Sequence, residues 1–150
     1  MIRQLTPGER ALARAMFGPA LALEPITIKR RKWFPFQPID VLMAPTGHVH
    51  VHPKSAMWSD DYSREHLGLQ GLLIHELTHV WQTQEKGKLY LPLMRHPFCR
   101  YRYTFEESRP FDRYGIEQQA ELVRHAFLAR AGQPVAGAPP LAQLERTLPF

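Results

Sequence analysis

The segment His75-Glu76-Leu77-Thr78-His79 contains the residues with the clearest chemical potential in this sequence. Two histidines four positions apart lie on one face of a helix, about one turn apart, so both imidazoles can bind a single cation. Glu76 projects beside the imidazoles toward a metal-bound water. This is the arrangement found in zinc hydrolases. The alternative is a pair of ordinary histidines on a helix surface.

A catalytic zinc ion usually has three protein ligands and a water, so His75 and His79 need a third partner. Glu117 and Glu121 lie one turn apart on a second helical segment, on a face that also carries basic residues. The sequence therefore predicts Glu117 as the third ligand. Glu121 is predicted to accept a hydrogen bond from the distal ring nitrogen of a ligating histidine. The alternative is a solvated pair of glutamates beside Arg124.

Helices must position these residues. Apolar residues at helical spacing predict helices over about 67–84 and 114–131, the first closed by Gly87 and the second ending before Gly132. Near the N-terminus, Thr6-Pro7-Gly8-Glu9 has the pattern of a capping box, which predicts a helix to about Phe17.

Strands are predicted where β-forming residues gather between prolines, over 25–34 and 47–52, with a short strand over 41–44. A long connection follows over 88–113, and a Pro/Ala-rich tail begins at about residue 133, with a turn of helix around 141–146. We therefore expect a single α+β domain over residues 1–150.

Composition excludes only extreme classes of protein. The chain has 150 residues, 44% of them hydrophobic, and a formal charge of +5, which favours acidic partners without indicating a fold. Its single cysteine, Cys99, excludes an intramolecular disulfide and a thiolate metal cluster. The N-terminus lacks a signal-peptide pattern, and no apolar run approaches the roughly 18 residues of a membrane span. These features predict a cytoplasmic protein without a membrane span, although export by a signal-independent secretion system would leave no mark.

Taken together, the motifs resemble those of the gluzincin type of zinc metallopeptidase. The match is His-Glu-x-x-His on one helix, followed by Glu117-Gln-Gln-Ala-Glu121 on a later one. The stretch Leu73-Ile-His-Glu-Leu-Thr-His-Val-Trp-Gln82 is similar to the active helix of small bacterial metallopeptidase domains of the DUF4157 kind. The whole chain also resembles short bacterial Vgr-related proteins, which implies an association with type VI secretion components.

The resemblance implies a minimal zincin-like domain in which a small twisted sheet packs on the active-site helix and a second helix supplies the third ligand. Zinc would be held by His75, His79 and Glu117, with Glu76 as general base and Glu121 where many gluzincins have Asp. The implied function is hydrolysis of amide bonds in peptides or peptide-bearing polymers. The alternative is a metal-stabilised, non-catalytic interaction module associated with a secretion system.

The group that would stabilise the oxyanion of the reaction has no motif. The candidates are His96, Tyr103, Tyr114 and His125. The strand over 48–52 is the candidate edge for pairing with an extended substrate.

Three further features have open interpretations. His48, His50 and His52 alternate along a strand, so they form either a second metal site, a lining of the cleft, or an exposed polar face with Val49 and Val51 packed inward. Residues 95–103 alternate cations with aromatics, which suits a lid over the zinc cleft, a nucleic-acid groove, or a solvated loop. A nucleic-acid binder would use basic side chains of this chain, but no recognition motif supports it, so no specific nucleic-acid partner is expected. Those side chains are Arg30, Arg31, Arg100 and Arg102.

Overall fold

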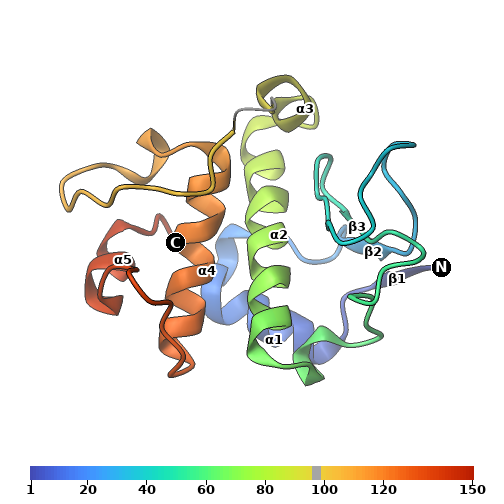
Figure 1. The fold of residues 1–150 in the computed structure, drawn as a ribbon, viewed down its shortest axis with the longest axis horizontal. Helices are drawn as coiled ribbons and strands as arrows, with labels where there is room; N and C mark the ends of the chain where they lie inside the picture. The colour runs from blue at the N-terminus through green and yellow to red at the C-terminus, as the bar shows by residue number, and fades with distance from the viewer. Residues whose placement is uncertain (96–98) are drawn as a thin grey trace.

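A long helix that carries the two histidines runs through the centre of the molecule (Figure 1). The computed structural model describes residues 1–95 and 99–150. Helix α4 (Ile116–Arg130) packs along one side of the central helix α2 (Leu67–Lys86), and a small sheet lies on the other side. The predicted α+β class, with a small sheet, is therefore confirmed.

The predicted helices form close to the predicted bounds. Helix α1 (Pro7–Phe17) begins at Thr6, whose hydroxyl accepts from the Glu9 amide at 3.1 Å, and the Glu9 carboxylate accepts from the Thr6 amide at 2.8 Å. Helix α2 ends at Gly87, whose φ of 97° is a conformation that side chains disfavour. Helix α4 ends one residue before Ala131, also close to its predicted end.

The sheet is smaller than predicted. Strand β1 (Ile2–Gln4) pairs antiparallel with β2 (Thr27–Lys29), which pairs parallel with β3 (Val49–His50). The strands predicted over 25–34 and 47–52 are thus too long, and 41–44 contributes only an isolated bridge from Met43 to His50. The pairing covers only two or three residues of each segment, and the segments are bordered by prolines, which cannot donate to a ladder. They are Pro25, Pro35, Pro45 and Pro53.

The connections contain short helices that the sequence pattern did not predict. Helix α3 (Tyr90–Met94) and a 3-10 turn (Phe111–Arg113) lie within the predicted connection over 88–113. Two other 3-10 turns lie at Gly18–Ala20 and Tyr62–Arg64. In the tail, α5 (Leu141–Thr147) forms where a turn of helix was predicted. Among the described residues, no helix is both long and apolar enough to cross a membrane.

Helices α2 and α4 run antiparallel and approach closely at Gly71. A Cβ atom at this position would lie 3.2 Å from Cδ2 of Leu128 and 3.4 Å from Cγ of Arg124, so these two side chains would have to shift to admit even an alanine. From this contact toward the C-terminal end of α2, the core is made of buried aliphatic side chains from both helices. They include Leu73, Ile74, Leu77, Val80, Leu122, Val123 and Ala126. The close approach brings the histidine face of α2 against the first turns of α4.

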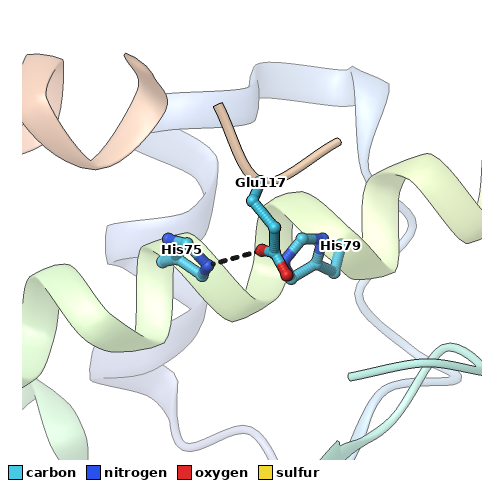
Figure 2. A group of neighbouring side chains, drawn as sticks. All are labelled: His75, His79 and Glu117. Atoms are coloured by element: carbon cyan, nitrogen blue, oxygen red, sulfur yellow. Dashed lines mark hydrogen bonds and ion pairs between the residues drawn. The ribbon is translucent and has the colours of Figure 1, made fainter. Parts of the chain in front are cut away.

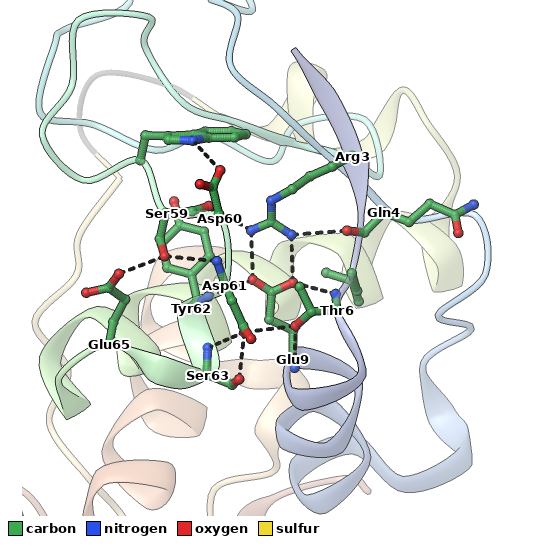
Figure 3. A network of polar contacts seen from close by, with 12 residues as sticks. Arg3, Gln4, Thr6, Glu9, Ser59, Asp60, Asp61, Tyr62, Ser63 and Glu65 are labelled. Carbon is green, nitrogen blue, oxygen red and sulfur yellow. Dashed lines mark hydrogen bonds and ion pairs between the residues drawn. The ribbon is translucent and has the colours of Figure 1, made fainter.

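A buried ion pair joins the N-terminal strand, α1 and the loop before α2 (Figure 3). The Glu9 carboxylate accepts from both terminal nitrogens of Arg3 at 2.8 and 2.9 Å, and from the backbone amides of Thr6 and Tyr62, each at 2.8 Å. The Arg3 guanidinium also donates to the Ser59 carbonyl at 2.8 Å. All hydrogen-bonding positions of the Glu9 carboxylate are thus used, which is what a fully buried charge requires.

We expect Glu9→Ala to lower the free energy of unfolding by about 3 kcal/mol, because it leaves the Arg3 charge and two backbone amides without their acceptor. Denaturant unfolding followed by circular dichroism measures the change. Glu24→Ala is the matched control, since Glu24 pairs with Arg10 at 3.3 Å in an exposed position and should contribute little. Equal losses in the two variants would contradict a special role for the buried pair.

Candidate metal centre

Three buried side chains from α2 and α4 converge on one point (Figure 2). Each of His75, His79 and Glu117 offers a ligand atom, and these atoms all lie within 4.8 Å of one another. Oε1 of Glu117 lies 3.2 Å from Nε2 of His75 and 2.5 Å from Nε2 of His79. The structure therefore brings together the three residues that the sequence predicted as metal ligands, although Glu117 lies about forty positions after the two histidines in the chain.

The outer ring nitrogens of the two histidines face acceptors. Nδ1 of His79 lies 2.8 Å from Oε1 of Gln82, and Nδ1 of His75 lies 3.7 Å from Oε2 of Glu121. An acceptor at Nδ1 favours a proton on that nitrogen, so Nε2, which faces Glu117, is the ring nitrogen available to a metal ion. Two imidazole nitrogens and one carboxylate oxygen are a donor set that suits a divalent metal ion. The group could hold such an ion, and Glu121 lies where the sequence predicted a supporting carboxylate.

Burial and charge pairing set the protonation of the group without a metal. Burial of the His75 imidazole lowers its pKa, but the carboxylates of Glu117 and Glu121 outweigh burial and raise it to about 9. Burial acts to raise the pKa of both glutamates, but their partners overcome it: His75 and His79 hold the pKa of Glu117 well below its ordinary range, and His75 and Arg124 lower that of Glu121 to about 2. The metal-free site therefore holds a proton on His75, which a metal ion would displace.

Glu76 is buried beside the same histidines. Burial raises the pKa of its carboxyl, and the charges of His75 and His79 oppose this shift. A cavity of about 370 Å³ is lined by both His75 and Glu76, so the Glu76 side chain borders a space that a substrate or water can enter. A buried carboxyl with a raised pKa is suited to accepting and returning a proton.

Gln82 fixes the orientation of His79 and was not singled out from the sequence. Its Nε2 donates to the Ile116 carbonyl at 3.0 Å and to Oε1 of Gln119 at 2.9 Å, which leaves Oε1 as the acceptor for His79. Gln119 in turn donates to the Tyr114 carbonyl at 2.9 Å. The signal was present in the sequence, because Gln82 lies three positions after His79 and therefore on the same helical face.

Two cavities meet at the candidate metal centre. The larger, of about 410 Å³, adjoins Glu117 and has a mostly apolar lining. Its wall is formed by Trp33, Phe34, Met43, Pro45, Leu91, Pro92, Arg95, Cys99 and Tyr101. The second is the cavity lined by His75 and Glu76, and Tyr101 lines both. The metal centre therefore lies in a cleft, with Tyr101 between its two parts.

Tyr101 is the second functional candidate that sequence reasoning missed. Its ring stacks on His75, with ring centres 5.8 Å apart and planes inclined by 18°. Burial and then the nearby Glu117 carboxylate raise the pKa of its phenol to about 12, so the hydroxyl keeps its proton at neutral pH. The sequence gave no periodic signal at this position, because Tyr101 lies in an irregular segment.

The four candidates for stabilising an oxyanion are not supported equally. His96 lies outside the described residues. The Tyr103 hydroxyl lies 2.6 Å from Nδ1 of His125, and the Tyr114 hydroxyl bonds the backbone of Glu106. These three side chains bond one another or the backbone. Tyr103 and His125 line a separate cavity of about 310 Å³ beside Glu121, whereas Arg95, Cys99 and Tyr101 line the cleft. For the described part of the stretch, residues 95 and 99–103, the cleft-lining positions of Arg95, Cys99 and Tyr101 favour the interpretation as a cover for the cleft.

The three alternating histidines do not form a second metal group within the described residues. Nδ1 of His48 lies 2.9 Å from the Thr27 hydroxyl, Nδ1 of His50 lies 3.3 Å from the Arg31 carbonyl, and Nδ1 of His52 accepts from the Lys54 amide at 3.1 Å. The predicted inward packing of the alternate valines is confirmed.

The prediction of an exposed polar face is wrong at His50, which is buried because the chain before β3 covers it. The prediction that the strand over 48–52 offers a free edge to an extended substrate is also wrong. Met43 exchanges backbone hydrogen bonds with His50 at 2.7 and 3.1 Å, so the edge of β3 is already paired there.

Comparison with known proteins places the chain in a family. No family model matches it. Over 135 residues it is 35% identical to the type VI secretion system spike protein VgrG2b of Pseudomonas aeruginosa, an alignment that covers 85% of this chain and 13% of that protein. The solved effector domain of Pseudomonas aeruginosa VgrG2b matches with a TM-score of 0.76 and 33% identity, over 95% of this chain and 79% of that chain. This chain belongs to the VgrG2b effector-domain family. The predicted Vgr-related resemblance is thus confirmed, and the chain spans only a small part of the whole spike protein.

In this chain we expect Gln82→Ala to weaken metal binding by about 10- to 100-fold, because His79 loses the acceptor that orients its ring. Competition with a chromophoric zinc chelator measures the affinity. Gln84→Ala is the matched control on the same helix, since the exposed Gln84 amide bonds the backbone of Ala22 on both sides, at 2.9 and 2.8 Å, and none of the candidate ligands. Equal affinities of the Gln82 variant and the native chain would show that Gln82 does not position the ligand.

Proposed function

We propose that this chain is a zinc-dependent hydrolase of amide bonds in peptides or peptide-bearing polymers, of the gluzincin type. The observation that carries the proposal is the convergence of His75, His79 and Glu117 in a cleft that Glu76 also borders. A site that only stabilised the fold would be closed by a fourth protein ligand. Here the predicted set has three ligands and adjoins a space large enough for a substrate side chain.

Zinc is the metal we propose, because two imidazoles and one carboxylate are a ligand set of catalytic zinc sites. A bound zinc ion supplies Lewis acidity, which polarises a carbonyl group and makes a water more acidic. The buried carboxylate of Glu117 and the half-buried one of Glu121 offset the charge of such an ion, and Glu121 would hold the His75 ring in place.

Glu76 acts as the general base and then as the acid. Its carboxylate takes a proton from the attacking water and delivers it to the nitrogen of the leaving amine. Burial of the carboxyl favours its protonated form, so the proton is retained between the two transfers. The position of Glu76 between the two histidines on α2 fixes the direction in which its side chain approaches the cleft.

Tyr101 supplies the hydrogen bond for the oxyanion that forms from the substrate carbonyl. Its ring is held parallel to His75, and the phenol keeps its proton at neutral pH. Tyr101 also borders both parts of the cleft, so a peptide that lies across the metal centre would pass this hydroxyl. Tyr101 thus fills the role for which the sequence offered no motif.

The alternative function is a non-catalytic module that a metal ion stabilises. The observation that favours it is the relationship to a spike protein and its effector domain, whose names concern type VI secretion. Delivery by a type VI secretion system suits either function, and we propose it for this chain. Both functions require bound zinc, and they differ in what the Glu76 carboxylate does.

We expect Glu76→Gln to retain zinc and to lose peptide hydrolysis by at least about a thousandfold, because the amide cannot accept the proton of the attacking water. Metal content of the purified protein and cleavage of a broad peptide library, read by mass spectrometry, give the two measurements. Asp40→Asn is the matched control, since Asp40 is exposed and lines the outer part of the same cavity. A zinc-loaded native chain that cleaves nothing in the library would favour the non-catalytic module.

We expect Tyr101→Phe to lower kcat by about 10²- to 10³-fold with little change in KM, because the hydrogen bond it removes strengthens only as the oxyanion develops. Steady-state hydrolysis of a peptide found in the library screen measures both constants. Tyr90→Phe is the control, a partly buried tyrosine outside the cleft lining. An unchanged kcat would remove Tyr101 from the mechanism and leave the role of Glu76 standing.

A further inference from the structure

Two segments that face each other across the larger cavity carry an unusual surface, which we call the cleft rim: residues 30–39 and 86–95. Trp33 and Phe34 line the cavity from the first segment, and Leu91 and Pro92 line it from the second. Figure 1 shows α3 at the upper end of α2, with the chain between β2 and β3 extending toward the same end. The cleft rim therefore surrounds one mouth of the cleft.

Large apolar side chains are exposed on the cleft rim. Among the described residues, the large exposed hydrophobic side chains outside the rim are Met1, Ile2 and Tyr101. Phe36 is 86% exposed, Leu93 78% and Leu89 71%. The remaining members of the group are Trp33, Phe34, Ile39 and Met94. Gathering of most such side chains at one place marks an interaction surface, whereas scattered ones need no explanation.

The fold holds these side chains outward. In the first segment the buried residue is polar: Gln37 accepts from the Trp33 amide at 2.8 Å and donates to the carbonyls of Val41 and His50 at 2.9 and 3.2 Å. Its neighbours Phe36 and Ile39 face solvent. In the second segment Leu91 is buried while Leu89 and Leu93 are exposed, which gives the short helix α3 an outward apolar face.

The charge of the chain is concentrated on the same two segments. They contain six lysines and arginines, all exposed, and no aspartate or glutamate, whereas the whole chain has a formal charge of +5. The rest of the chain is therefore close to neutral. The six basic residues are Arg30, Arg31, Lys32, Lys86, Lys88 and Arg95. Cations next to exposed tryptophan, phenylalanine and leucine are the composition of surfaces that bind the interface of an anionic bilayer.

We propose that the cleft rim docks on a lipid bilayer that contains anionic phospholipids. The cations lie near the lipid headgroups, and Phe36, Leu89 and Leu93 enter the boundary between headgroups and acyl chains. A peptide substrate does not explain these three side chains, because they point outward and are not part of the cavity lining. Docking is independent of the proposed hydrolysis, because none of the rim residues that we place in the bilayer is a candidate ligand or base.

Co-sedimentation of the full, zinc-loaded chain with vesicles tests the proposal. We expect binding to vesicles of equal parts phosphatidylglycerol and phosphatidylcholine, and little binding to phosphatidylcholine alone. Phe36→Ser/Leu93→Ser should weaken binding by at least about tenfold, because it removes two inserting side chains. Ile2→Ser is the control for an exposed apolar residue outside the rim. Equal binding to both kinds of vesicle, or to neither, would overturn the proposal.

A second pair of variants tests the charges. Arg31→Gln/Lys88→Gln should weaken vesicle binding by about thirtyfold at low salt, since each cation near an anionic surface contributes about a factor of five. Arg14→Gln/Arg64→Gln removes the same net charge from exposed positions outside the rim and should change binding by less than about threefold. Equal losses in the two variants would show that the overall charge, and not the cleft rim, drives binding.

An acidic polypeptide is the competing partner, and soluble poly-glutamate is the probe for it. If poly-glutamate binds as tightly as the anionic vesicles and Phe36→Ser/Leu93→Ser weakens neither, the rim recognises an acidic chain and the bilayer proposal is wrong. The Glu76→Gln protein should bind vesicles as the native chain does. Loss of hydrolysis with intact vesicle binding, or the reverse, therefore separates failure of one proposal from failure of the other.

Discussion

A buried carboxylate held against two imidazoles is the constraint on which the rest of this structure depends. Glu117 needs positive charge nearby to stay ionised inside the protein; its partners His75 and His79 come from a different helix, and Arg95 lies 3.9 Å from its Oε2. In the metal-free state the proton on His75 provides that positive charge. A divalent ion provides more of it and bonds all three groups at once, so the same packing that brings the groups together favours metal uptake.

The antiparallel pairing of α2 and α4 is what satisfies this constraint. Gly71 permits the close approach at one end, and the Gln82–Gln119 amide pair joins the helices at the other. The metal-binding atoms lie between these two contacts, so a shift of either helix would change the separation of Glu117 from the histidines. The sheet lies on the other side of α2, and the Arg3–Glu9 pair joins its first strand to α1, so both stabilise the fold without contributing ligands.

Sequence reasoning succeeded where a function depends on local periodicity. His75, Glu76 and His79 follow from spacing on one helix, and Glu117 from its place on the next. It failed where tertiary contacts decide the result. The strands pair over only two or three residues, the His50 side chain is buried, and its backbone is bridged by Met43, none of which a pattern around His50 reveals.

The place of Tyr101 at the site could not be predicted from the sequence either, because Tyr101 reaches the site from an irregular segment whose path is set by packing. Gln82 is different. Its spacing from His79 was readable, and what the sequence lacked was a reason to expect an amide in the supporting position.

The cleft rim and the metal centre are built from different parts of the fold, and this separation has a consequence for substrate choice. The rim is anchored through Gln37 and Leu91, whereas the ligands are anchored in α2 and α4. A bilayer against the rim would place one mouth of the cleft at the lipid surface, and the rim residue Arg95, 3.9 Å from Oε2 of Glu117, connects that surface to the metal centre. Catalysis would then be limited to amide bonds presented at that surface, since a docked rim restricts which chains can reach Glu76. Specificity in such a protein would come from where the cleft is held as much as from the side chains that line it.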